Sequence, residues 1–88
     1  MTANNITVSV RFFARLRESL DTDKLSLNLP TGANAGKVLE TLALRGGKWR
    51  QLTDGTALVI AVNQAIARPS TPLNNNDEVA VFPPVTGG

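Results

Sequence analysis

The run from residue 79 to residue 88, Val-Ala-Val-Phe-Pro-Pro-Val-Thr-Gly-Gly, holds the residues best suited to chemistry in this 88-residue chain. Gly87 and Gly88 have no side chains, so they can enter a narrow channel and adopt backbone angles closed to other residues. Pro83 and Pro84 cannot continue a sheet and hold the chain extended. Six residues from Pro83 onward reach at most about 20 Å, at roughly 3.3–3.6 Å each. The pattern predicts a C-terminal carboxylate that works in another protein's active site; a frayed terminus is the alternative.

The composition excludes several kinds of self-contained site. Without cysteine the chain has no disulfide, no thiolate nucleophile and no thiolate metal site. Without histidine it lacks the commonest general base and the commonest metal ligand. The carboxylates show no calcium-loop spacing. We therefore expect a protein that is not catalytic alone and binds no metal or cofactor, with its chemistry in the terminus or in a partner.

The charge pattern argues against nucleic acid as a partner. The formal net charge is only +2, whereas nucleic-acid binding usually needs more positive charge, and Trp49 lies within one of the basic clusters. No apolar stretch is long enough to span a membrane, so we expect no membrane partner. The first five residues have neither the basic start nor the apolar run of a signal peptide, which predicts a cytoplasmic protein.

Alternating apolar residues predict the strands of a single domain. In residues 6–13, apolar side chains occur at every second position, which is typical of a half-buried strand. Asn63-Gln64 suits a tight hairpin turn, because asparagine tolerates positive φ. The predicted strands cover residues 6–13, 25–29, 57–62, 65–67 and 78–82.

One main helix is predicted between the second and third strands. Asn34 is a candidate N-cap, and apolar residues recur at helical spacing from Val38 to Leu42. Gly46-Gly47 is expected to close the helix, and Gly36 to loosen its first turn at a cost of about 1 kcal/mol. Residues 14–20 suggest a turn or brief helix, and residues 48–56 a loop with one helical turn around 49–52.

This order of elements predicts an α+β fold with one helix packed across a mixed sheet of four or five strands. A β-grasp is the natural candidate, with its first and last strands central and parallel. Residues 1–82 would form the β-grasp domain and residues 83–88 an extended, flexible tail.

The strand alternation also predicts which residues lie beside the tail. Arg11 and Phe13 face away from the apolar set of the first strand, and Phe82 precedes the tail. An exposed aromatic patch here would suit a partner interface. Alternatively, Phe13 and Phe82 only pack on each other, and Arg11 only solvates the surface. Trp49 is expected to cover the helix end rather than to bind a partner.

Three segments resemble one known family. Residues 73–88 read Leu-Asn-Asn-Asn-Asp-Glu-Val-Ala-Val-Phe-Pro-Pro-Val-Thr-Gly-Gly, residues 10–18 read Val-Arg-Phe-Phe-Ala-Arg-Leu-Arg-Glu, and residues 61–64 read Ala-Val-Asn-Gln. They resemble the C-terminus, first strand and central hairpin of molybdopterin synthase small subunits, the MoaD-type sulfur carriers of the MoaD/ThiS ubiquitin-like family. Asn76 stands where this family often has glycine, and asparagine is well suited to a left-handed turn position.

The resemblance implies a ubiquitin-like β-grasp whose C-terminal glycine carries sulfur. A MoeB-type activating enzyme would use ATP to adenylate the carboxylate of Gly88, which is then converted to a thiocarboxylate. The adenylate and the thiocarboxylate would both be transient covalent states of the C-terminus. The tail would enter a MoaE-type large subunit, in a complex of two small and two large subunits, and give sulfur to cyclic pyranopterin monophosphate to form the molybdopterin dithiolene. The residues expected to contact partners are Arg11, Phe13, Phe82, Pro83, Pro84, Val85, Thr86 and Gly87.

Three other functions stay open at this point. A sulfur carrier for thiamine or cysteine synthesis would share the fold and the two glycines, although Phe-Pro-Pro-Val-Thr before them favours molybdopterin synthesis. A ubiquitin-like modifier would join lysines through Gly88 after the same activation. A binding module with an inert tail would keep its function when Gly88 is deleted.

Overall fold

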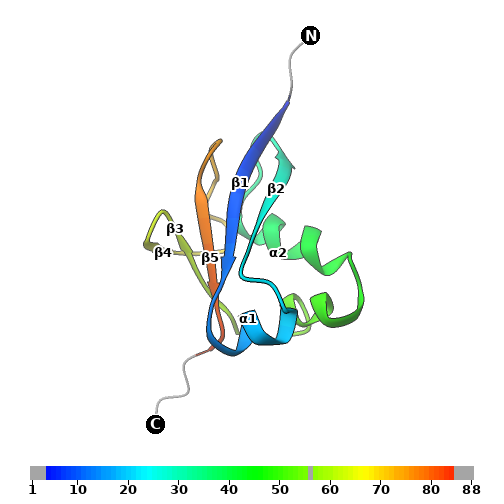
Figure 1. Cartoon of the computed structure of the whole chain (residues 1–88). Coiled ribbons are helices and arrows are strands. Elements are labelled where there is room, and N and C mark those ends of the chain that lie inside the picture. Colours follow the sequence, from blue (N-terminus) through cyan, green and yellow to red (C-terminus); the bar gives the residue numbers. More distant parts are fainter. Residues whose placement is uncertain (1–3, 56, 85–88) are drawn as a thin grey trace.

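Two parallel strands lie side by side in the middle of the sheet. The computed structural model describes residues 4–55 and 57–84. Strand β1 (Asn5–Phe12) pairs in parallel with β5 (Glu78–Phe82). Strand β2 (Lys24–Pro30) flanks β1, while β3 (Val59–Val62) and then β4 (Ala65–Ala67) flank β5, in the order β2-β1-β5-β3-β4 (Figure 1). The expected α+β arrangement, with central parallel first and last strands, is confirmed.

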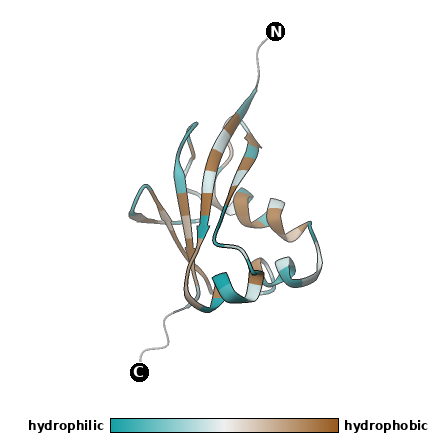
Figure 2. Cartoon of the chain, in the orientation of Figure 1, coloured by the Kyte–Doolittle hydropathy of each residue, from teal (hydrophilic) through white to brown (hydrophobic). Residues whose placement is uncertain are grey.

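One face of this sheet forms the core. Apolar and polar residues alternate along β1 (Figure 2), and the apolar ones are buried. Helix α2 (Ala35–Ala43) packs on this face, while the short helix α1 (Ala14–Leu20) and the 3₁₀ helix η1 (Gly47–Leu52) close one end of the core. The fully buried large side chains are Val8, Val10, Phe12, Leu20, Leu29, Val38, Leu42, Val79 and Val81. The opposite side of the sheet, which α2 does not cover, is called the open face below.

Helix α2 begins as predicted and ends earlier than predicted. The side chain of Asn34 accepts a hydrogen bond from the backbone N–H of Lys37 at 3.0 Å, so the expected N-cap is confirmed. The expectation that Gly46-Gly47 closes the helix is wrong, because the C-cap is Leu44 in a right-handed conformation. The two glycines, with φ of 77° and 58°, instead turn the chain from α2 into η1.

Gly36 lies where the loop before β5 approaches α2. Its N–H donates to the carbonyl of Pro69 at 2.8 Å, and a Cβ on Gly36 would lie only 3.2 Å from two atoms of Pro69. Glycine therefore allows a close backbone contact here, which gives a reason for its weak helix propensity being tolerated.

The turns expected to hold asparagine at positive φ do so. Asn63 and Gln64, at φ of 50° and 72°, connect β3 to β4, and Asn76 has a φ of 72°. Strand β3 starts at Val59, two residues later than expected.

Trp49 packs into the core edge, as expected for a cover over the helix end. Its ring meets the ring of Phe12 edge-on at 5.8 Å, and the guanidinium of Arg45 lies over it at 4.9 Å. Within residues 4–55 and 57–84, none of the helices has the length and apolar character needed to cross a membrane.

Candidate partner interface at the root of the tail

Three side chains stack on the open face where β1 and β5 end. The guanidinium carbon of Arg11 lies 5.2 Å from the centre of the Phe13 ring, and the Phe13 ring stacks on Phe82 with 4.6 Å between centres. The two rings are nearly parallel, at 13°. Parallel pairing produces this arrangement, since Phe13 directly follows β1 and its N–H donates to the carbonyl of Val81 at 3.3 Å.

The stack borders a hollow of about 340 Å³ in the open face. Small side chains leave room for it, because Ala61 and Ala80 are opposite each other on β3 and β5. Ile66 on β4 lines the same hollow and is 78% exposed. A contiguous apolar patch of several residues is characteristic of a protein interaction site, whereas an isolated exposed apolar side chain is common on any protein surface.

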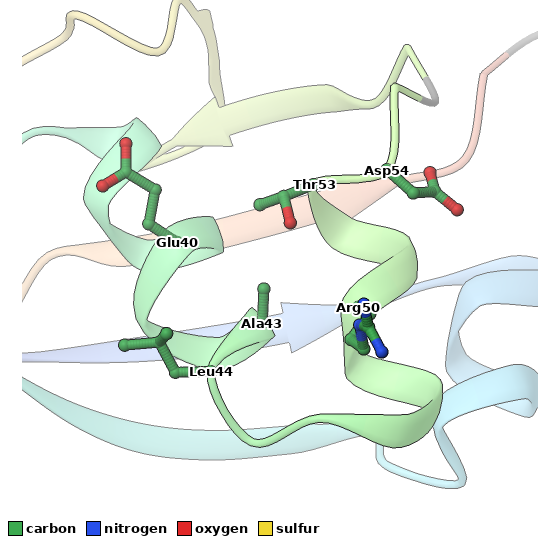
Figure 3. A pocket seen from close by; sticks show the side chains of 6 residues that line it. All are labelled: Glu40, Ala43, Leu44, Arg50, Thr53 and Asp54. Atoms are coloured by element: carbon green, nitrogen blue, oxygen red, sulfur yellow. The ribbon is translucent and has the colours of Figure 1, made fainter.

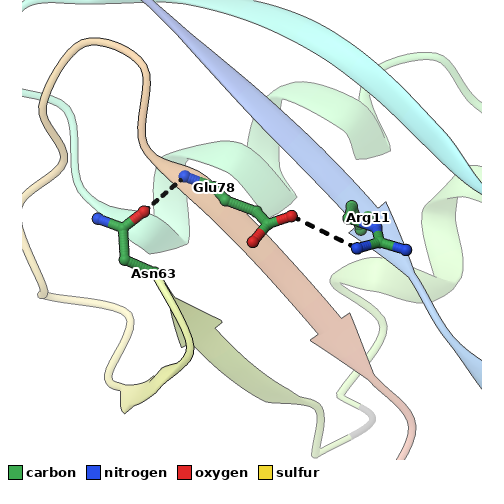
Figure 4. Close-up of polar contacts among 3 residues, drawn as sticks. All are labelled: Arg11, Asn63 and Glu78. Atoms are coloured by element: carbon green, nitrogen blue, oxygen red, sulfur yellow. Dashed lines mark hydrogen bonds and ion pairs between the residues drawn. The ribbon is translucent and has the colours of Figure 1, made fainter.

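Glu78, which also lines this hollow, makes polar contacts with residues on both sides of it. Glu78 lies 3.5 Å from a terminal nitrogen of Arg11, and its N–H donates to the side-chain oxygen of Asn63 at 2.9 Å (Figure 4). The Asn63 amide nitrogen donates to Asp77, also at 2.9 Å. Asn63 thus fixes the β3–β4 turn against the start of β5. The Arg11–Glu78 pair is about 40% exposed at each side chain, so its contribution to stability is small, about 0 to 1 kcal/mol.

Pro83 and Pro84, which we call the tail root, leave the sheet between two further hollows. One, of about 410 Å³, is lined by apolar residues that include Ala14, Val59 and Ile66. The other, of about 260 Å³, is lined from α1 and η1, and Arg15 and Gln51 contribute to it. Ala14 has a φ of 55°, a strained conformation for a residue with a side chain. Its position beside the tail root fits the general placement of backbone strain at functional sites.

A hollow of about 420 Å³ lies elsewhere, between α2 and η1. Figure 3 shows its side chains on two facing segments, among them Glu40 of α2, Leu44 at the C-cap of that helix and Arg50 of η1. It lies on the helix side of the sheet, away from the Arg11–Phe13–Phe82 stack. None of the predicted site residues that the structure describes lines it. In the described part of the chain, no group of three or more acidic side chains could hold a metal ion.

The structure brings together the predicted site residues that it describes. Arg11, Phe13 and Phe82 stack, and Pro83 and Pro84 follow directly. The predicted residues Val85, Thr86, Gly87 and Gly88 lie outside the described residues.

Three residues of this surface, Ile66, Glu78 and Ala14, were not predicted from the sequence. The alternation of Ala65-Ile66-Ala67 could have placed Ile66 outward. Glu78 could be found only from the register that sets it opposite Ser9. Ala14 carries no sequence signal for its positive φ.

Curated relatives of the chain share one description. It is 40% identical over 81 residues to the molybdopterin synthase sulfur carrier subunit of Haemophilus influenzae, covering 92% of this chain and 99% of that protein. It is 36% identical over 83 residues to the Escherichia coli protein of the same description, again with 92% and 99% covered.

Solved structures share the fold. A Haloferax volcanii protein superposes with a TM-score of 0.83 at 27% identity, covering 100% of this chain and 92% of that one. Small archaeal modifier protein 1 of Methanosarcina acetivorans gives 0.73 at 27%, covering 98% and 100%. A complex of subunits 1 and 2 of the Helicobacter pylori molybdopterin-converting factor gives 0.62 at 26%, covering 94% and 100%. The ThiS family model matches residues 10–88, and the chain therefore belongs to the ThiS family.

Proposed function

We propose that this chain is the sulfur carrier subunit of a molybdopterin synthase and that Gly88 carries the sulfur on its terminal carboxylate. The relatives described by that name, at 36–40% identity over 92% of the chain, support the assignment. The structural observation that carries it is the path of β5. This central strand runs into Pro83 and Pro84 beside an apolar surface, which is what delivery of a terminus to a partner requires.

The chemistry follows from the low reactivity of a carboxylate toward nucleophiles. An oxygen of the Gly88 carboxylate attacks the α-phosphorus of ATP, and pyrophosphate leaves. A sulfur nucleophile then displaces AMP and leaves a thiocarboxylate. In the synthase, this sulfur is transferred to cyclic pyranopterin monophosphate, and two carriers supply the two sulfurs of the dithiolene. Since the chain has no cysteine, no thiol of its own competes for the activated carbonyl.

The tail residues have separate roles in this proposal. Residues 1–82 form the domain, and residues 83–88 form an extended tail that spans up to about 20 Å. Gly87 lets the backbone pass a narrow channel. The prolines reduce the conformational entropy lost when the tail is inserted, which favours binding.

The partner is a MoaE-type large subunit, and the open face is the surface that it contacts. The Helicobacter pylori neighbour, a complex of subunits 1 and 2, supports this pairing. Phe13 and Phe82 supply aromatic contact area, which commonly dominates binding energy. We further propose that a MoeB-type enzyme activates the tail, and that the chain works in the cytoplasm within a complex of two small and two large subunits.

Reconstitution tests this function. The chain, a MoeB-type enzyme, ATP and a sulfur donor are combined with the large subunit and the pyranopterin precursor, and molybdopterin is measured. Deletion of Gly88 should abolish product while the unfolding temperature stays unchanged, because the domain does not depend on the tail. Product formation by the deletion variant at the wild-type rate would contradict the proposal.

One observation favours a second candidate function. The neighbour from Methanosarcina acetivorans is a small archaeal modifier protein, and a modifier would use the same activated glycine. Isopeptide adducts between Gly88 and lysines of other proteins, found by mass spectrometry of cells, would support that role. Their absence would leave sulfur transfer as the sole role of the tail.

A further inference from the structure

The open face carries an excess of positive charge at one point. Arg11 and Lys24 are directly opposite each other on β1 and β2, so their side chains leave the sheet on the same side. Like charges in that relation destabilise a sheet. Among the described strand residues of this face, Glu78 is the one carboxylate, and it lies beside Arg11. Two cations and one carboxylate leave a net charge of +1.

The guanidinium of Arg11 is held in place with few of its donors used. It lies over the Phe13 ring, which is itself fixed by Phe82. A guanidinium has five N–H donors. In the described part of the chain, the guanidinium approaches one acidic side chain: a terminal nitrogen lies 3.5 Å from a carboxylate oxygen of Glu78. This distance is long for a charge-assisted hydrogen bond. The Nε atom of Arg11 is buried and has no acceptor among the described residues.

The residues around Arg11 offer its guanidinium few hydrogen-bond acceptors in place of water. The hollow that it borders is otherwise lined by Phe13, Ala61, Ile66, Ala80 and Phe82, with Gln64 and Glu78 as the polar members. A partner that covers the hollow excludes water from the Arg11 donors that are exposed in the free chain. Leaving such donors unpaired costs binding energy, and a carboxylate would remove both this cost and the excess charge.

We propose that the protein partner of the open face places a carboxylate against Arg11, surrounded by apolar side chains. Arg11 then selects the partner, because a partner without this carboxylate must bury the guanidinium unsatisfied. A carboxylate fits better than a phosphate group or a neutral oxygen, since it matches the planar donors of arginine and balances a charge of +1. The inference rests on the proposed function, which identifies the large synthase subunit as the partner.

The test measures the affinity of the large subunit for four variants by titration calorimetry. Arg11→Met should weaken binding roughly 10- to 100-fold, as expected for a lost charge-assisted hydrogen bond. Lys24→Met is the matched control, because it removes the same charge from the neighbouring position on the same face. It should change affinity by less than about 3-fold. Glu78→Gln should have a similarly small effect.

The charge exchange Arg11→Glu with Glu78→Arg separates internal pairing from partner recognition. It keeps an ion pair within the chain but moves the cation, so binding should stay as weak as in Arg11→Met. Recovery of wild-type affinity by the exchange would overturn the proposal, as would equal losses from Arg11→Met and Lys24→Met. Raising the salt concentration should weaken wild-type binding more than Arg11→Met binding; identical salt dependence would point to a neutral acceptor and also overturn it.

The same titrations separate this inference from the proposed function. If the wild-type chain binds the large subunit and every variant binds equally well, only the role of Arg11 is refuted. If the wild-type chain does not bind the large subunit at all, the proposed function fails and the inference fails with it. Circular dichroism of each variant confirms that the fold is intact.

Discussion

Phe12 and Phe13 are neighbours in the sequence but lie on opposite sides of the sheet. Phe12 is fully buried, meets Trp49 edge-on and belongs to the core beneath α2. Phe13 is half-exposed on the open face, where it stacks between Arg11 and Phe82. The same residue type therefore serves stability on one side and a contact surface on the other. Substitutions on one face of this sheet should therefore leave the role of the other face intact.

The largest expected effect comes from breaking the buried side. Phe12→Ala should lower the free energy of unfolding by about 3–5 kcal/mol, because it leaves a cavity in a close-packed core. Phe13→Ala should cost only about 0.5–1.5 kcal/mol, the value of an aromatic pair. Urea denaturation of both variants measures the contrast. Equal losses would mean that the two faces do not differ in the way described.

The second-largest expected effect is on binding of the large subunit by the open face. Phe82→Ala should weaken affinity for the large subunit by about 2 kcal/mol, or about 30-fold, as central aromatic residues of interfaces commonly do. Leu44→Ala is the control, since Leu44 is 86% exposed but lies at the C-cap of α2, away from the open face. Surface plasmon resonance of both variants measures the difference. A loss for Leu44→Ala as large as that for Phe82→Ala would remove the open face from the interface.

A smaller effect compares two asparagines. Asn34 caps the helix that covers the core, whereas Asn28 accepts a hydrogen bond from Thr7 on the open face. Asn34→Ala should lower stability by about 1 kcal/mol, and Asn28→Ala by less than about 0.5 kcal/mol. Thermal unfolding of the two variants measures the loss of stability that each substitution causes. The comparison is contradicted if Asn28→Ala proves the more damaging change.

The smallest effect concerns the strained residue at the tail root. Ala14→Gly should raise stability by about 0.5 kcal/mol, because relief of the left-handed strain exceeds the added backbone entropy. The unfolding temperature should rise by about 2–4 °C. Ala43→Gly, in the ordinary conformation of α2, should instead lower stability by about 0.5–1 kcal/mol. A fall in the unfolding temperature of Ala14→Gly would show that its methyl group matters more than the strain.

The sequence predicted the two faces of the sheet better than the contacts across them. Alternation in β1 separates the buried set from Arg11 and Phe13, because side chains on a strand point to opposite sides in turn. The cap at Asn34 and the turn at Asn63 were also predictable, since both depend on local chemistry. The end of α2 was not, because two glycines at positive φ suit either a helix cap or the turn into the next helix.

The candidate site was predictable only in part for a related reason. The proximity of Arg11 to Glu78 depends on the parallel register that joins residues nearly seventy positions apart, which no local pattern encodes. The exposure of Ile66 depends on β4 being an edge strand that no helix covers. Composition and motifs thus identify the chemistry of the tail, whereas the surface beside it requires the assembled sheet.

High-resolution mass spectrometry of the C-terminal peptide, from protein made in its native host, determines whether Gly88 carries sulfur. Peptide mapping is needed because oxidation of Met1 or Trp49 adds nearly the same mass as exchanging one oxygen for sulfur. We expect a fraction of the molecules to carry sulfur in place of oxygen on the carboxyl group of Gly88. A plain carboxylate in every molecule, in cells whose sulfur-transfer enzymes are active, would contradict it.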